Sequence, residues 1–383
     1  MTAPASPPIP VIVTLAIAAH WWLWPYSGID IGVFLLPWFR HIQETGPIVA
    51  FAEQFGNYAP PYLYLLAGST LLDRWFDPVD LVKALSAAGS LALVGAVCHL
   101  LRTLDPARRH SRAALMTLLL PTTLLNAALM GQCDAMWAAG CVMAVAAALR
   151  HRHGAMLAWC GLAFAFKLQA IFLAPFILAL LIQRRVSITL WPIAGAVWLV
   201  SLLPAWLAGW PSADLLTIYL RQSDWSPDLA LNAPNIWMIV DAWPAAAALP
   251  LGGLAFACAA GAACAYVVRV VNLRLADNRC LMEMATLAPL IVVGLLPRMH
   301  ERYFFLADVL ALVSALAWPD RRSIGIAALV QIGSLLAVLA YLSGISGLAM
   351  IGAVPMITAT ARLARPLWRR PAGVPASGVR AVG

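Results

Sequence analysis

The chain has 383 residues, of which 62% are hydrophobic and only 11% are charged, and its mean hydropathy is +0.83. Soluble domains carry roughly 25% charged residues, so a chain this apolar cannot cover itself with a water-compatible surface. The composition excludes a soluble globular protein and leaves room for about ten to thirteen membrane-crossing helices. We expect one integral-membrane domain that spans residues 1–383.

The net charge of +8 does not indicate a nucleic-acid partner, because of where the basic residues stand. Lys83 and Lys167 are the two lysines, and most of the arginines form short clusters between apolar runs. Such clusters normally mark the cytoplasmic ends of membrane spans. The seven cysteines include no CxxC pair, so we expect small hydrophobic side chains rather than disulfides or a zinc site.

Apolar runs, taken in chain order, predict an all-α polytopic membrane protein with about twelve transmembrane helices. The first run has no Lys or Arg before it and no small-residue cleavage site after it, so we expect a retained span rather than a signal peptide. One long run is divided at Lys167, because a lysine is costly at the centre of a bilayer. The predicted spans are 9–26, 81–101, 113–130, 134–149, 154–166, 168–183, 187–208, 243–268, 280–296, 302–318, 322–342 and 345–361.

The distribution of arginine orients these spans. Placing both termini in the cytoplasm puts most of the 25 basic residues on that side, including a basic tail at 362–383. This orientation requires residues 59–72 to dip into the membrane without crossing it. We expect a multi-pass protein of the bacterial inner (plasma) membrane. A first periplasmic loop at 27–80 and a second periplasmic segment at 209–242 mix Trp, Tyr and Pro with charges, as interfacial helices do.

Three polar clusters in the first half of the chain fall on the periplasmic side. Asp30 directly follows the first span, where it could act as a general base or simply meet interfacial water. Tyr58 precedes a double proline, in a stretch that fits either the wall of a site or an aromatic membrane anchor. Gln132 and Asp134 lie in a tight turn between two spans, where Asp134 could cap the following helix.

Two further clusters carry cations. Lys167 and Gln169 form a polar apex between two short apolar arms, although snorkelling is an alternative explanation for the lysine. The segment 297–303 is the most informative of the chain. It holds Arg298, His300, Glu301 and Arg302. One arginine could simply neutralise the acid, but two arginines and a histidine beside one carboxylate leave a surplus of positive charge, as a phosphate site requires.

Other features limit the chemistry. Arg221 is a weaker candidate, because its default role is that of a solvated loop residue. The sequence has neither a P-loop nor a GxGxxG motif, so a group donor that reaches the outer face is expected to be lipid-linked. No Asp-x-Asp or His-rich set lies near Asp30, and arginine and lysine would then meet the charge of a leaving phosphate. We expect no metal and no other cofactor.

The ordered set of clusters resembles the integral-membrane glycosyltransferases of the GT-C superfamily, which use polyprenyl-phosphate sugars. The resemblance covers nearly the whole chain and is greatest to dolichyl-phosphate-glucose-dependent glucosyltransferases and to bacterial polyprenyl-phosphate mannosyltransferase-like proteins. It rests on Asp30, Tyr58-Ala59-Pro60-Pro61, Gly131-Gln132-Cys133-Asp134, Lys167-Leu168-Gln169 and His300-Glu301-Arg302. The chain departs from the pattern at Ala59, before the double proline, and at Arg302, where the glucosyltransferases carry lysine.

The resemblance implies a GT-C-like fold and a role for each cluster. Asp30 would be the general base of an inverting hexosyl transfer from a polyprenyl-phosphate donor to an envelope glycan or glycolipid on the periplasmic face. The donor and its phosphate would be bound by Lys167, Gln169, Arg298, His300 and Arg302. Supporting positions would be Tyr58, Gln132, Asp134, Glu301 and Arg221.

Two other functions fit parts of the sequence. A transporter or flippase of lipid-linked glycans is the main alternative, but it should show polar residues near mid-membrane in both halves and a related pair of repeats. A glycan ligase is a third possibility. It would be expected to carry its major outer loop late in the chain, whereas the large loop is early here.

Overall fold

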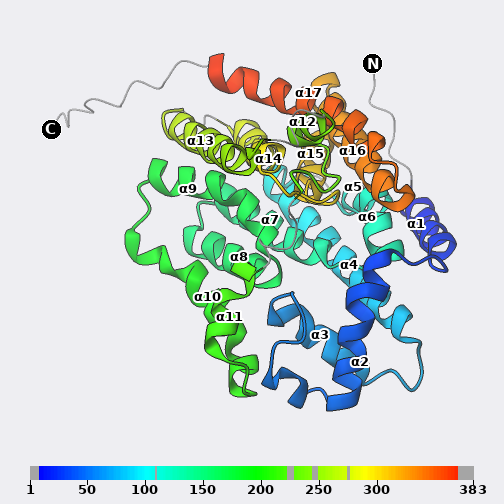
Figure 1. Ribbon diagram of the computed structural model, residues 1–383. Helices are drawn as coiled ribbons and strands as arrows, with labels where there is room; N and C mark the ends of the chain where they lie inside the picture. Colours follow the sequence, from blue (N-terminus) through cyan, green and yellow to red (C-terminus); the bar gives the residue numbers. More distant parts are fainter. Residues whose placement is uncertain (1–7, 108–109, 222–227, 244–248, 274–276, 370–383) are drawn as a thin grey trace.

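A computed structural model describes residues 8–107, 110–221, 228–243, 249–273 and 277–369. These residues are helices joined by short connections, and no strand lies among them (Figure 1). In Figure 1, α2, α3 and α11 lie at the lower end, whereas α13, α16 and α17 lie at the upper end. The all-α architecture is the predicted one.

The first half of the chain alternates long helices with short, broken ones. Several begin with proline, which fits the first turn because its missing N–H has no partner there in any case. The elements are α1 (Ile9–Leu23), the π-helix η1 (Ile31–Leu35), α2 (Leu36–Thr45), the 3-10 helix η2 (Val49–Ala52), α3 (Pro60–Thr70), α4 (Pro78–Leu104), α5 (Ser111–Leu115), the 3-10 helix η3 (Met116–Leu119), α6 (Pro121–Leu124), the π-helix η4 (Leu125–Leu129), α7 (Asp134–Leu149), α8 (His153–Phe166), the 3-10 helix η5 (Leu168–Leu173) and α9 (Ala174–Gln183).

The second half contains most of the long apolar helices. Two of them begin at aspartate caps, since Asp277 accepts from the Cys280 N–H and Asp320 from the Arg322 and Ser323 N–H groups. The elements are the 3-10 helix η6 (Ile188–Leu190), α10 (Pro192–Leu207), α11 (Ser212–Arg221), α12 (Ile236–Asp241), α13 (Leu251–Val271), α14 (Asn278–Leu295), α15 (Phe305–Ala317), α16 (Arg321–Ser343) and α17 (Gly347–Arg369).

Each of the twelve predicted apolar ranges overlaps one or more described helices, and residues 244–248 of the range 243–268 lie outside the described part. Six described helices are long and apolar enough to cross a membrane, and the pair 111–119 and 121–129, bent by 65° at the Leu120–Pro121 step, passes the same test as one broken span. Five shorter apolar helices accompany them: Ile9–Leu23, Asp134–Leu149, His153–Phe166, Leu168–Gln183 and Phe305–Ala317. The chain is a polytopic membrane protein.

The segment 27–80 contains the expected short helices. The range 59–72 contains α3 (Pro60–Thr70), whose 11 residues fall short of the roughly 20 that a crossing needs. Its length is therefore compatible with a segment that only enters the membrane. In the later segment 209–242, α11 and α12 are described and residues 222–227 lie outside the described part. The predicted tail at 362–383 begins inside α17, and residues 370–383 are not described.

The core is centred on α7, which is buried along nearly its whole length. Its alanines and Gly140 let neighbouring helices approach closely, as small residues do between membrane helices. A Cβ added at Gly140 would lie 2.8 Å from the Cβ of Ala163 on α8. The helices α4 and α8 both pack against α7. This packing positions the turn before α7 and the end of α8, where the polar residues lie.

Candidate active site

The five polar clusters meet at one cavity of about 170 Å³. The side chains that line it belong to η1 and α2, the turn before α3, the turn before α7, the interruption between α8 and η5, the turn before α15, and α16. The lining side chains are Asp30, Phe34, Leu35, Trp38, Asn57, Tyr58, Gln132, Lys167, Gln169, His300, Arg302, Tyr303 and Tyr341. Sequence positions more than 300 residues apart thus face one space.

Asp30 is held in the cavity by three donors. The Gln132 amide donates to Oδ2 at 2.8 Å, and the Tyr341 hydroxyl donates to Oδ1 at 2.7 Å. The Arg302 guanidinium lies 3.1 Å from Oδ2. The residue is only 8% exposed, so its carboxylate depends on these partners rather than on water. The Asp30 carboxylate, at the N-terminal end of η1, is thereby held in a fixed orientation.

Two glycines set the backbone around Asp30. The Gly28 N–H donates to the Leu129 carbonyl at 2.8 Å, which ties the loop before Asp30 to the end of η4. Gly131 has φ +61°, a left-handed conformation that glycine adopts without steric cost. A Cβ there would lie 3.1 Å from Ile31, the neighbour of Asp30. This close contact brings the turn that carries Gln132 against the segment that carries the acid.

Asp134 is the first residue of α7 and is fully buried. Lys167 donates to its Oδ1 at 2.7 Å, Trp137 donates to the same oxygen at 2.8 Å, and Asn126 donates to Oδ2 at 2.7 Å. The capping role considered from the sequence is absent, because the cap position is Cys133 and no side chain bonds the helix end there. Asp134 instead neutralises a buried lysine.

The helix is interrupted at Lys167, where the sequence predicts an interruption. Its φ of −160° and ψ of 140° are extended, α8 ends one residue earlier, and η5 begins one residue later. The break points the ammonium group at Asp134 and within 3.4 Å of the Gln132 Oε1. Gln169, on the first turn of η5, lines the same cavity and is 5% exposed.

Arg302 is shared among three carboxylates. Its guanidinium lies 2.5 Å from Glu301, 3.1 Å from Asp30 and 3.6 Å from Asp134. The sequence predicts a surplus of positive charge at this cluster, and the structure differs, because two carboxylates from distant segments join Glu301 around Arg302. With Lys167 included, three carboxylates face two full cations, and the partly exposed His300 stands beside Glu301 at 3.7 Å.

The charges stabilise one another against burial. Burial raises the pKa of the Glu301 carboxyl, but the Arg302 guanidinium and His300 outweigh it, so that this pKa lies below its ordinary value. Burial lowers the pKa of Arg302, and Glu301 and Asp30 more than offset that effect. Burial raises the pKa of Tyr58 well above its usual value, so its neutral hydroxyl donates to Gln132 at 2.6 Å.

Two predicted site residues lie elsewhere. Arg298 is not among the residues that line the cavity; its φ of +60° and its backbone bond to Leu229 belong to the turn before His300. Arg221 lines a neighbouring cavity, where it pairs with Asp214 on α11. Sequence reasoning missed Tyr341, which lies within an apolar helix 311 positions from its partner Asp30. A tyrosine inside a hydrophobic run carries no local signal.

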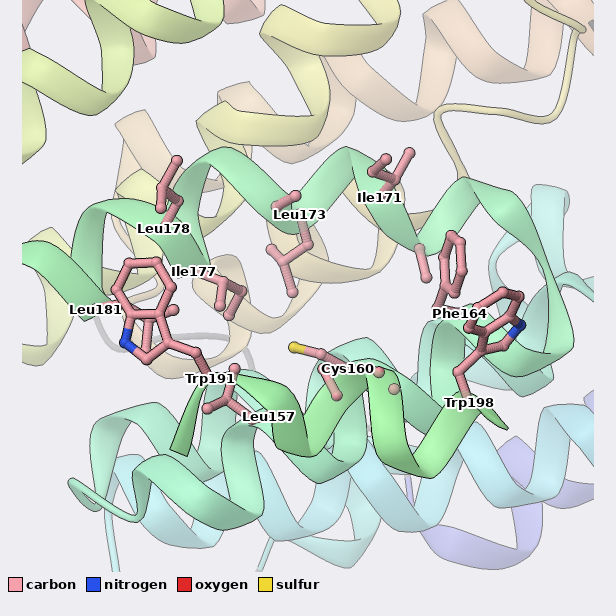
Figure 2. Close-up of a pocket in the computed structure, with 15 residues that line it drawn as sticks. Leu157, Cys160, Phe164, Ile171, Leu173, Ile177, Leu178, Leu181, Trp191 and Trp198 are labelled. Carbon is pink, nitrogen blue, oxygen red and sulfur yellow. The ribbon is translucent and has the colours of Figure 1, made fainter. Parts of the chain in front are cut away.

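An apolar groove adjoins the break at Lys167 (Figure 2). It has a volume of about 340 Å³ and lies between α8, η5, α9 and α10. Phe164 and Trp198 lie at one end, and Leu181 and Trp191 at the other. Gln169 lines the cavity of Asp30, whereas the next residue, Ala170, lines the apolar groove. A single turn of η5 therefore separates the polar cavity from the apolar groove.

No protein-family model and no curated protein sequence matches this chain. Its structure is similar to the crystal structure of ArnT from Cupriavidus metallidurans bound to undecaprenyl phosphate, with a TM-score of 0.53 and 14% sequence identity. The similarity covers 94% of this chain and 77% of that chain. The chain has the GT-C fold. The fold implied by the sequence resemblance is therefore confirmed, and at this identity the likeness concerns the fold alone.

Within the part of the chain that the structure describes, no three His, Cys, Asp or Glu side chains are grouped so that they could hold a metal ion. The polar groups around the cavity instead form one network of carboxylates, cations, amides and hydroxyls. Such a network can accept a proton at Asp30 and can present positive charge from Arg302 and Lys167 to an anionic group.

Proposed function

We propose that the chain is an inverting GT-C glycosyltransferase that moves a hexose from a polyprenyl-phosphate donor to an envelope glycan or glycolipid. The reaction would take place on the periplasmic face of a bacterial inner membrane, with both termini in the cytoplasm. The observation that carries the proposal is the position of Asp30, which lies in one cavity with Arg302, Lys167 and Gln169. A carboxylate that can take a proton and cations that can meet a phosphate are the two groups that this transfer needs.

In the proposed reaction, Asp30 accepts the proton of an acceptor hydroxyl while that oxygen attacks the anomeric carbon of the donor sugar. The bond from the anomeric carbon to the phosphate oxygen breaks on the opposite side, so the configuration inverts and polyprenyl phosphate leaves. Arg302 and Lys167 stabilise the charge that develops on the leaving phosphate. His300 and Gln169, which line the cavity beside them, provide hydrogen bonds to the phosphate or the sugar.

The apolar groove supports a lipid-linked donor. A polyprenyl chain has no hydrogen-bonding groups, so it requires an apolar surface that starts close to the phosphate site. The groove of Figure 2 begins at the turn that also carries Gln169 and runs along the α8–η5–α9 hairpin. ArnT, which has a similar fold, is bound to undecaprenyl phosphate in its crystal structure. That lipid is therefore the first probe to use.

The test compares cells that have the gene with cells that lack it. Lipid-linked and envelope glycans of both strains are released and analysed by mass spectrometry. A hexose should be missing from one glycan in the deletion strain, and its unmodified precursor should accumulate. In parallel, undecaprenyl phosphate should raise the unfolding temperature of the purified protein in nanodiscs. Identical glycans in the two strains, together with no effect of the lipid, would refute the proposal.

A further inference from the structure

A second polar cavity opens beside the one that holds Asp30. It has a volume of about 480 Å³ and contains both aromatic and amide groups. Its lining side chains are Phe34, Trp38, Gln54, Phe55, Gly56, Asn57, Ile218 and Arg221. Phe34, Trp38 and Asn57 also line the cavity of Asp30, so the two cavities adjoin and share a wall.

The helix that starts at Asp30 connects the two spaces. Asp30, Phe34 and Trp38 follow one another at intervals of four residues along η1 and α2, and all three face the cavity of Asp30. The last two continue into the second cavity. A molecule seated in the second cavity would therefore extend toward the carboxylate along a row of aromatic rings.

The lining of the second cavity has the chemistry of a sugar subsite. Aromatic ring faces pack against the C–H faces of pyranose rings, whereas sugar hydroxyls need donors and acceptors of fixed direction. Phe55 is half-buried and stacks on His41 with ring centroids 4.7 Å apart, which holds it in place. Gln54 is fixed by its own bond to the Gly56 carbonyl at 3.1 Å and by the Arg221 guanidinium, 3.1 Å from its Oε1. The polar groups are thus positioned before any ligand arrives.

The charge of the cavity selects among sugars. Among the lining residues that the structure describes, Arg221 is the one charged side chain, and it is paired with Asp214. No unpaired carboxylate or cation therefore contributes to the described lining. We infer that this second cavity is the acceptor subsite and that it binds a neutral saccharide, whose hydroxyl reaches Asp30 in the adjoining space. The inference rests on the proposed function and specifies two things about its acceptor: where it binds, and that the sugar which receives the hexose is neutral rather than charged.

The test fills the cavity without altering the donor site. Gln54→Trp places a ring inside the cavity, and Glu53→Trp, at the exposed neighbouring position that does not line it, is the matched control. Both variants are expressed in cells that lack the gene, and the ratio of modified glycan to its precursor is measured. Gln54→Trp should lower this ratio about tenfold or more, which corresponds to the loss of about 1.4 kcal/mol of acceptor binding or more. Glu53→Trp should match the original chain.

Undecaprenyl phosphate serves as the donor-site probe for the same proteins. It should raise the unfolding temperature of Gln54→Trp as much as that of the original chain, because the phosphate site is untouched. If Gln54→Trp does not accumulate, Gln54→Leu, which removes the amide without adding a ring, takes its place and should also lower the ratio. The inference is overturned if the variant that folds modifies the glycan normally, or if the accumulated precursor is modified on a group other than a neutral sugar. The absence of any gene-dependent glycan with the original chain would instead overturn the proposed function and the inference with it.

Discussion

Arg302→Gln should destabilise the fold strongly, because Arg302 compensates three buried carboxylates at once. The Glu301 side chain is 0% exposed and that of Arg302 is 11% exposed, so water cannot replace the lost partner. Lys167 is the other full cation at the cavity, and it is already paired with Asp134 at 2.7 Å. Among the described residues, the variant would leave Asp30 without an ion-pair partner and Glu301 with His300 alone, at 3.7 Å.

The expected size of the effect follows from burial. Removing one partner of a buried pair costs about 3–5 kcal/mol, because the other charge stays desolvated and unpaired. Proteins unfold with a total free energy of about 5–15 kcal/mol, so this loss would be visible as a shifted unfolding transition. The double variant Arg302→Gln/Glu301→Gln removes one of the uncompensated charges and should regain about half of the loss. It should not regain glycan transfer, because no guanidinium returns to the cavity.

The assay is equilibrium unfolding in mixed micelles at increasing SDS mole fraction, with transfer measured in cells. Arg221→Gln is the matched control for the unfolding measurement alone, since its guanidinium pairs with Asp214 at a side-chain exposure of 54% and the variant should change stability by less than about 1 kcal/mol. Equal unfolding of Arg302→Gln and the original chain would show that Arg302 does not compensate the buried acids. A double variant that is less stable than the single one would refute the charge argument as well.

Three further predictions follow from the geometry around Asp30. Asp30→Asn should abolish transfer while protein level and unfolding stay near those of the original chain; transfer at the normal rate would contradict the role of Asp30 as base. Tyr341→Phe removes one of three donors to Asp30 and should lower transfer about tenfold, with a stability change of about 1 kcal/mol, and unchanged transfer in cells would show that the hydroxyl is dispensable. Gly131→Ala forces a left-handed φ of +61° on a residue whose Cβ would lie 3.1 Å from Ile31, so it should destabilise by about 1–3 kcal/mol in the SDS titration, and a stability equal to that of the original chain would refute this.

The helices were largely predictable because each one corresponds to a local run of apolar residues in the sequence. Runs of apolar residues predict helices at α4, α13 and α16, and the cost of a buried lysine predicts the break at Lys167. The distribution of arginine alone led to the prediction that residues 59–72 dip into the membrane without crossing it, and the 11 residues of α3 are compatible with that prediction. The same local signals do not report how helices are arranged around one another, so α7 was not predicted as the centre of the core.

The site was predictable where a polar residue interrupts an apolar context, as Asp30, Gln132 and Lys167 do. The contribution of Tyr341 was not predictable, since one tyrosine in an apolar helix has a membrane-facing or packing role by default. The charge of the 297–303 segment was misjudged for a related reason. The prediction added up only the charges of residues that are adjacent in the sequence. In the structure, Asp30 and Asp134, which belong to distant segments, also lie beside Arg302 and offset its positive charge.

The shared position of Arg302 gives a physical reason for arginine where the resembling glucosyltransferases carry lysine. A guanidinium has five donors in a planar fork, so it can hold a carboxylate on one edge and present another edge to an anion. An ammonium group has three donors around one nitrogen and could not reach Glu301 and Asp30 while also meeting a phosphate. Under the proposed function, a donor phosphate that approaches Arg302 competes with Asp30 for the same guanidinium. Gln132 and Tyr341 keep the carboxylate in place while that exchange occurs, because their bonds to it do not involve the arginine.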